Sequence, residues 1–179
     1  MWKRFKHPNI VPFIGVTWDP LQFVSEWMPN GTLTQYLCKN PEVNRICLVS
    51  LSFIEITPHL IKPSPKLLDI AEGLTFLHVN YTTHGDLKGV GAFYLWFWTK
   101  LMTFGQPNIL INHDGHACLT DFGFSSVVRG MDSVSVTEVQ GYTPRWAAPE
   151  VLGGGDKNTW EADVFAFGMV MVEVCLCIF

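Results

Sequence analysis

Apolar and polar positions alternate in short runs over the first thirty residues, and this pattern predicts two strands. Residues 10–18 and 21–28 are rich in Val, Ile, Phe and Trp, which favour strands. An Asp-Pro turn signal separates the runs, which indicates an antiparallel pair joined by a tight turn. A Pro-Asn-Gly turn then ends the second run, and Thr32 can cap a short helix that continues through Leu37.

Apolar positions at helical spacing predict an amphipathic helix over residues 67–78. Its expected buried stripe consists of Leu67, Ile70, Ala71, Leu74 and Leu77. Residues 41–48 are also helix-like, with Pro at the first position. The intervening residues 49–66 hold three prolines and begin like a strand, so they cannot continue that helix.

Two further apolar runs, 108–112 and 117–123, flank a polar His-Asp-Gly-His turn. This arrangement predicts a second, compact β-hairpin. A polar stretch rich in Ser, Val and Thr follows as far as Gln140, and the chain ends in an apolar helix expected from Glu161.

Composition excludes several classes of function. The chain has 179 residues, enough for one domain with a core, and its net charge of −4 offers no basic footprint for nucleic acid. The five cysteines fit neither a zinc site nor a disulfide framework, which favours reduced thiols and a cytoplasmic location. No secretory signal follows Met1. The apolar stretches 90–104 and 164–179 are too short for a membrane span, and each carries a charge.

Acidic and amide side chains near the apolar runs form a set suited to phosphoryl transfer. Asp86 lies two residues before Lys88, Asn108 opens one run, and Asp121 ends another before Phe-Gly. Transfer of a phosphoryl group needs positioning and charge neutralisation, and Mg²⁺ prefers carboxylate and amide oxygens. Each residue alone is weak evidence, because a strand-end Asp is more often a turn former. Their order, continued by Ala-Pro-Glu and Asp163, argues against coincidence.

On these motifs the chain resembles the eukaryotic protein kinases. HGDLK with PNIL is similar to their catalytic loop, DFG to the metal-binding motif, APE to the end of the activation segment, and DVFAFG to the central helix of the large lobe. KHPNIV resembles the segment after the small-lobe helix, and FVSEWMPNGTL the hinge. The resemblance implies an α+β kinase-like fold, with a partial small lobe and hinge over residues 1–28 and an incomplete, mainly helical large lobe over 29–179.

The resemblance also implies roles for the residues of the catalytic motifs. Asp86 would be the base that orients the substrate hydroxyl, and Lys88 would neutralise charge on the transferred phosphate. Asn108 and Asp121 would hold Mg²⁺. Lys88, two residues after Asp86, and Thr143 resemble the serine/threonine pattern. The Trp of RWAAPE resembles the tyrosine-kinase-like group, whose members mostly phosphorylate Ser and Thr of protein substrates.

ATP would bind between the lobes. Glu26 and Met28 would offer backbone groups to adenine, Ser25 would guard the back pocket, and Leu110 would lie beneath the ring. His84 and Phe122 would pack in a spine between the lobes, and Asp163 would brace the catalytic loop. Structural and activation-segment roles therefore fall to His84, Phe122, Gly123, Thr143, Glu150 and Asp163.

Some positions depart from the family pattern. Gly85 stands where an Arg usually receives an activation-loop phosphate, so phosphates on that segment would lack their main partner. The Gly-rich loop and the Lys that anchor ATP phosphates would precede residue 1. The helices that complete the large lobe would follow residue 179, which would leave Glu150 without its usual Arg.

Two segments interrupt the resemblance. Asp86 and Asn108 are 22 residues apart, far more than in the family, and removing residues 90–106 restores the pattern. Removing about 49–66 joins the two helix-like segments. Both segments begin with Val and a small residue, as expected from a GT splice donor, which supports the hypothesis of translated introns. The alternative is a genuine loop whose Trp96 and Trp98 form an apolar patch for a protein partner.

Three functions stay open on sequence alone: a Ser/Thr protein kinase, a pseudokinase-like binding module, and a product without function. The 179-residue chain by itself is expected to aggregate and not to transfer phosphate. Phosphate anchors are absent, 17 extra residues part Asp86 from Asn108, and Phe165, Phe167, Met169 and Val172 lack the helices that would bury them.

Overall fold

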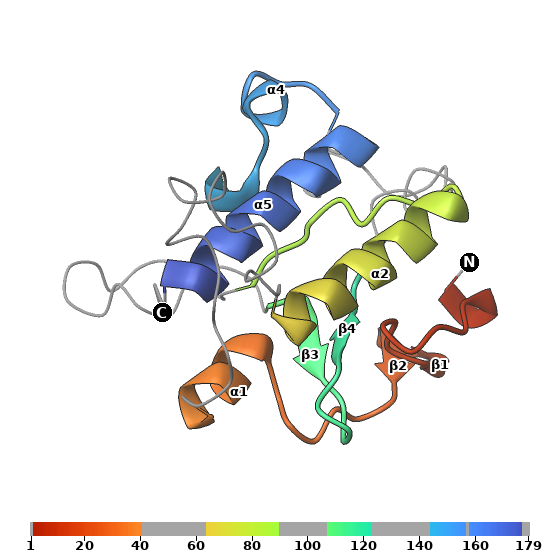
Figure 1. Ribbon diagram of the computed structural model, residues 1–179. Coiled ribbons are helices and arrows are strands. Elements are labelled where there is room, and N and C mark those ends of the chain that lie inside the picture. Colours follow the sequence, from red (N-terminus) through yellow and green to blue (C-terminus); the bar gives the residue numbers. More distant parts are fainter. Residues whose placement is uncertain (1, 41–63, 90–106, 123–143, 157, 177–179) are drawn as a thin grey trace, which may run out of the picture.

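The computed structural model describes residues 2–40, 64–89, 107–122, 144–156 and 158–176 (Figure 1). Helices α2, Pro65–Val79, and α5, Trp160–Leu176, cross the molecule, and two small antiparallel sheets lie to one side of them. This mixed architecture confirms the expected α+β class. The predicted helix 41–48, most of segment 49–66 and all of segment 90–106 lie outside the described residues.

The first predicted hairpin is confirmed. Strand β1, Phe13–Trp18, pairs antiparallel with β2, Leu21–Ser25, and Thr17 Oγ1 donates to the Pro20 carbonyl across the turn. Most apolar side chains of this hairpin are exposed in the described part of the chain, including Ile14 and Trp18. A short 3₁₀ helix, η1, Trp2–Arg4, precedes the hairpin and contacts β1.

Helix α1, Leu33–Lys39, begins where the capping pattern predicts. The Thr32 side chain accepts a hydrogen bond from Gln35 N, and the Gln35 side chain accepts one from Thr32 N. Both bonds satisfy backbone N–H groups that the first turn of a helix leaves without partners. The helix buries Leu33 and Leu37 in the main core.

Helix α2 begins at Pro65, so the last two residues of the segment predicted as an insert, 49–66, belong to this helix. Four of the five predicted stripe residues are buried, and Ala71 is partly buried. Gly73 allows a close approach, because a Cβ there would lie 2.8 Å from the Asn9 carbonyl oxygen and 3.2 Å from the Leu119 side chain.

The second predicted hairpin is also confirmed, and it lies beneath α2 (Figure 1). Strand β3, Ile109–Ile111, pairs antiparallel with β4, Ala117–Leu119. The residues before β1 extend this layer, since Val11 N donates to the Leu119 carbonyl and Leu119 N to the Asn9 carbonyl. Residues 9–11 therefore pair with the edge of β4, while α2 packs on the hairpin.

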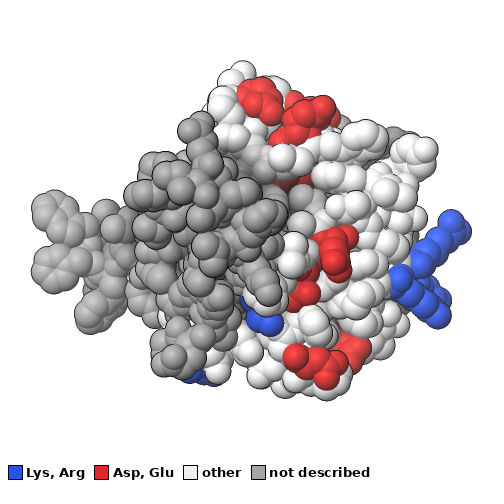
Figure 2. All heavy atoms as spheres, in the orientation of Figure 1, with Lys and Arg blue, Asp and Glu red and all other residues white. Residues whose placement is uncertain are grey.

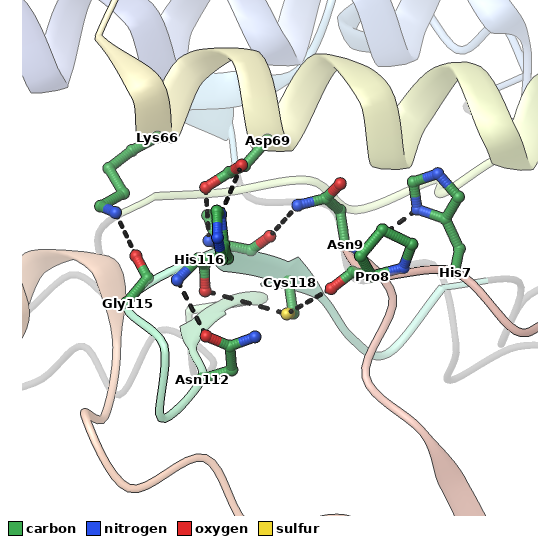
Figure 3. A network of polar contacts seen from close by, with 10 residues as sticks. His7, Pro8, Asn9, Lys66, Asp69, Asn112, Gly115, His116 and Cys118 are labelled. Atoms are coloured by element: carbon green, nitrogen blue, oxygen red, sulfur yellow. Dashed lines mark hydrogen bonds and ion pairs between the residues drawn. The ribbon is translucent and has the colours of Figure 1, made fainter.

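Polar contacts tie the turn of this hairpin to α2 (Figure 3). Asp69 accepts a hydrogen bond from Ala117 N at 2.9 Å, and its other oxygen lies 3.1 Å from His116 Nδ1. Lys66 donates to the Gly115 carbonyl at the same turn. Burial raises the pKa of the Cys118 thiol to about 12, with the carboxylates of Asp69 and Glu26 adding to the effect, so this thiol stays protonated.

The C-terminal part consists of η3, Pro144–Trp146, α4, Pro149–Leu152, and α5. The prediction that four side chains of α5 lack burial was wrong for two of them. Phe167 and Met169 pack against the main core, whereas Phe165 and Val172 are exposed. Among the helices described here, none combines the length and hydropathy needed to cross a membrane.

Candidate active site

The loop that follows α2 is hydrogen-bonded to the side chain of Asp163, which lies in the first turn of α5. The Asp163 carboxylate accepts hydrogen bonds from His84 N at 2.7 Å and from Gly85 N at 2.8 Å. Gly85 has a φ of +78°, a left-handed conformation that glycine adopts without a steric penalty. These bonds fix the backbone immediately before Asp86.

Asp86 contacts both Lys88 and Asn108. Lys88 Nζ lies 2.7 Å from Asp86 Oδ2, and Asn108 Nδ2 donates to the Asp86 carbonyl at 2.7 Å. The backbone N–H of Asn108 also donates to the Lys88 carbonyl at 3.2 Å. The expectation that the extra residues part Asp86 from Asn108 is therefore wrong, because the chain on either side of segment 90–106 is joined by hydrogen bonds.

Asp121 follows β4 in a left-handed conformation, with a φ of +58°. Desolvation raises the pKa of its carboxyl group, and Asp86 adds to that rise, whereas His84 and Lys88 oppose it. A bound cation would stabilise a carboxylate in such surroundings. The Asn108 side-chain oxygen accepts no hydrogen bond from a described residue, because the amide nitrogen makes the contact with Asp86.

This donor set fits Mg²⁺, which takes one or two protein oxygens together with phosphate oxygens and water. Within the described ranges no cluster of three His, Cys, Asp or Glu side chains could hold a metal by itself. The assignment of Asn108 and Asp121 as its protein ligands stays a prediction from the sequence.

The predicted nucleotide residues lie at the end of β2, on the segment after it, and on β3. Glu26 N donates to the Pro12 carbonyl, and the Met28 carbonyl accepts from Gly31 N. Among the described residues, the Glu26 carbonyl and the Met28 N–H have no hydrogen-bond partner, so both can face a ligand. Met28 is buried, and Leu110 packs against the same small cluster. Ser25 is partly buried and pairs with Phe13 across the hairpin.

Aromatic rings form a column from the catalytic loop to the first sheet. His84 and Phe122 are 6.3 Å apart between ring centroids, Phe122 and Trp2 5.2 Å, and Trp2 and Phe13 5.3 Å. Sequence reasoning placed His84 and Phe122 in one spine but missed Trp2, Phe5 and Phe13. The available signal was the concentration of aromatic residues on both sides of the KHPNIV motif.

His84 is buried inside this column. Burial lowers the pKa of its ring below the ordinary value, although the carboxylates of Asp163, Asp86 and Asp121 act in the opposite direction. The Asp86 backbone N–H donates to His84 Nδ1 at 3.3 Å. A neutral imidazole with Nδ1 as acceptor explains both observations.

A hollow of about 330 Å³, including space open to solvent, lies beside Asp86. Gly85, Leu87, Trp146 and Val151 are among the residues that line it. Trp146 is anchored beneath the hollow, because its Nε1 donates to the buried Glu173 carboxylate at 3.1 Å. Sequence reasoning treated Glu173 only as a charge in an apolar stretch, so it missed this contact.

Three predicted site residues remain to be placed, Glu150, Gly123 and Thr143. Glu150 is exposed and makes no ion pair with any residue in the described ranges. Gly123 and Thr143 lie outside the described residues. In the coloured and white part of Figure 2, which covers only described residues, acidic side chains are spread widely and basic ones gather mainly at one edge.

Comparisons with known proteins agree with this geometry. The family described as "Protein tyrosine and serine/threonine kinase" matches residues 1–90, and "Protein kinase domain" matches residues 105–177. Residues 91–104, between the two matches, fall inside the segment 90–106.

Similar curated proteins include the probable serine/threonine-protein kinase pats1 of Dictyostelium discoideum, 31% identical over 96% of this chain and 4% of that protein. Serine/threonine-protein kinase STY46 of Arabidopsis thaliana is 30% identical over 96% of this chain and 24% of its own length. Human serine/threonine-protein kinase TNNI3K is 28% identical over 96% of this chain and 17% of its own length. The chain thus spans less than a third of the length of each of these relatives. The two family matches show that it belongs to the protein kinase family, and the relatives named here are serine/threonine kinases.

Proposed function

We propose that this chain carries the hinge, catalytic loop and metal ligands of a kinase that transfers phosphate from ATP to Ser and Thr of protein substrates. The observation that carries the proposal is the contact of Asp86 with Lys88 and Asn108, which lie 2 and 22 residues further along the chain. Asp121 is close enough for its pKa to respond to both Asp86 and Lys88.

Each group has a chemical task in this proposal. The Asp86 carboxylate accepts a hydrogen bond from the substrate hydroxyl and orients its oxygen toward the phosphate. Lys88, whose ammonium group already lies 2.7 Å from Asp86, offsets negative charge on the group being transferred. Asn108 and Asp121 would hold Mg²⁺, which neutralises charge on phosphate oxygens when it is bound.

The nucleotide would lie along the segment after β2. The Glu26 carbonyl and the Met28 N–H match the donor and acceptor pattern of an adenine edge, Leu110 supplies an apolar surface, and Ser25 borders the back of the site. A protein substrate would bind on the side of Asp86 and the hollow. A cytoplasmic location, predicted from cysteine usage, forms part of this proposal.

The test measures peptide phosphorylation and ATP binding for the 179-residue chain and for a fusion that adds flanking kinase-domain residues of the STY46 relative. In the fusion, Asp86→Asn is expected to lower turnover about 100-fold or more, because it removes the carboxylate that orients the hydroxyl. Its affinity for ATP is expected to stay within about twofold of the parent, since the carboxylate acts on the transition state.

Asp114→Asn is the matched control, because Asp114 lies exposed on the β3–β4 turn. Equal turnover by the Asp86 variant and the parent would contradict the role of Asp86. A fusion that binds ATP without transferring phosphate would favour the pseudokinase-like module. The 179-residue chain alone is predicted to be inactive.

A further inference from the structure

We propose that His78 is a positioning residue for the catalytic loop, a role that rests on the proposed kinase function. It donates a hydrogen bond to Asp163 and so holds the carboxylate that binds the backbone before Asp86. Sequence reasoning assigned His78 only to the end of a helix.

His78 lies in the last turn of α2, 85 residues before Asp163 in the chain. Its Nε2 atom lies 2.9 Å from Asp163 Oδ2. The Asp163 side chain is 2% exposed and that of His78 is 18% exposed, so water competes little for this contact. One buried carboxylate thus joins the end of α2, the start of α5 and the catalytic loop.

The direction of the hydrogen bond follows from the other partners of Asp163. The backbone N–H groups of His84 and Gly85 can only donate, so both carboxylate oxygens act as acceptors. An ionised carboxylate has no proton to give, which means that His78 Nε2 carries the hydrogen. Asp163 Oδ2 therefore receives two donors, from His78 and His84, and Oδ1 receives one from Gly85.

This third donor determines how the carboxylate is turned. Without His78, each oxygen of Asp163 would accept one hydrogen bond from the described backbone, Oδ2 from His84 N and Oδ1 from Gly85 N. The carboxylate could then rotate, and rotation would weaken one of these two bonds. Hydrogen bonds to charged groups are stronger than neutral ones, and a buried acceptor that loses a donor is destabilised. Loss of the His78 donor is therefore expected to loosen the amides of His84 and Gly85, and with them the position of Asp86.

Trp160 fixes the orientation of the His78 ring. The two rings are stacked, with 6.0 Å between centroids and an angle of 24° between planes. Trp160 is the first residue of α5 and precedes Asp163 by less than one turn. The same helix end thus provides both the acceptor for the ring nitrogen and the surface on which the ring lies.

The test is amide hydrogen exchange in the full chain, compared for the parent, His78→Phe and His78→Gln. Phe keeps a ring on Trp160 but has no donor, whereas Gln keeps an N–H donor. In His78→Phe the amides of His84 and Gly85 are expected to exchange at least tenfold faster, while those of Ile70 and Leu74 in α2 change less than twofold. His78→Gln is expected to restore most of the protection.

Unchanged protection in His78→Phe would overturn the proposal, and so would failure of His78→Gln to restore it. If His78→Phe does not fold, the tautomer of the neutral His78 ring in the parent decides, measured by ¹⁵N NMR. A proton on Nε2 supports the proposal, and a proton on Nδ1 overturns it. Neither measurement requires phosphate transfer, so the outcome is independent of whether the kinase proposal holds.

In an active fusion the same His78→Phe change is expected to lower kcat at least tenfold with KM for ATP within twofold. The reason is that the change displaces Asp86 and leaves the nucleotide contacts in place. His78→Gln should recover most of kcat. A loss that appears equally in kcat and in ATP affinity would contradict a positioning role.

Discussion

The two hairpins of this protein have similarly apolar sequences but opposite surroundings. In β1–β2, Ile14 is 65% exposed and Trp18 79% exposed, whereas Ile109, Ile111 and Leu119 of β3–β4 are fully buried. Helix α2 packs on β4, and the Asn9–Val11 backbone pairs with Leu119. An apolar strand pattern therefore predicts the strand, while burial depends on which other elements reach it.

The largest expected effect comes from removing a side chain of the covered hairpin. Leu119→Ala should lower the free energy of unfolding by about 2–5 kcal/mol, because it leaves a cavity in the main core next to α2. Ile14→Ala in the open hairpin is the matched control, expected to cost less than about 1 kcal/mol. Urea unfolding of both variants measures the difference, and equal losses would show that the two hairpins are equally covered.

The close approach of α2 to β4 gives a second prediction. Gly73→Ala should destabilise the protein by about 1–3 kcal/mol, because its Cβ would lie 2.8 Å from the Asn9 carbonyl oxygen. Gly168→Ala in α5 is the control, since nothing lies within 4 Å of its Cβ and alanine favours the helix by about 1 kcal/mol. Thermal unfolding should therefore shift in opposite directions, and a stabilising Gly73→Ala would show that the contact is looser.

The buried side chain of His84 makes the stability of the protein depend on pH. Because burial lowers the pKa of folded His84, the unfolded chain takes up the proton first as pH falls through 6.5. Its contribution to stability should be intact above 6.5 and decline below it until the folded pKa is reached. Urea midpoints at about pH 7.5 and 5.5 test this, with His113→Gln as the exposed control. The His113→Gln variant keeps His84, so its midpoint should decline with that of the parent. A parent that is more stable at the lower pH would contradict the burial of His84.

The smallest expected effect concerns the open hairpin. Trp18→Thr should change the free energy of unfolding by less than about 0.5 kcal/mol, because the Trp18 side chain is 79% exposed and Thr also favours strands. Aggregation during purification should decrease, since a large apolar side chain is removed from the surface. A loss above about 2 kcal/mol would mean that this face is covered after all.

Local elements were predictable from the sequence because their causes are local. Thr32 and Gln35 satisfy each other's backbone groups within one turn, and the spacing of Leu67 and Leu77 follows the helical repeat. Both hairpins were predicted from apolar runs on either side of turn residues. The order of the catalytic motifs predicted the residues of the site, because each motif stands next to a strand or helix end.

Contacts between distant parts of the chain were not predictable in the same way. The rings of Trp2 and Phe122 pack against each other in a tilted arrangement, and His78 contacts Asp163, although no periodicity or motif links either pair. The buried Glu173 was likewise inferred only as an interruption of an apolar stretch. Each of these contacts depends on how elements distant in the chain pack together, as when the end of α2 meets the start of α5 at His78 and Asp163.

The sequence by itself predicted the elements and their apolar faces, since these depend on neighbours within a few residues. The order of its motifs grouped Asp86, Lys88, Asn108 and Asp121 into one candidate chemical set. Only the tertiary structure decided that Asn108 N bonds to the Lys88 carbonyl across the intervening segment, and that Asp163 holds His84 and Gly85. A separation along the chain places no fixed distance on two residues whose flanking elements are packed together. For that reason Asp86 and Asn108, 22 positions apart in the sequence, are joined by a hydrogen bond of 2.7 Å.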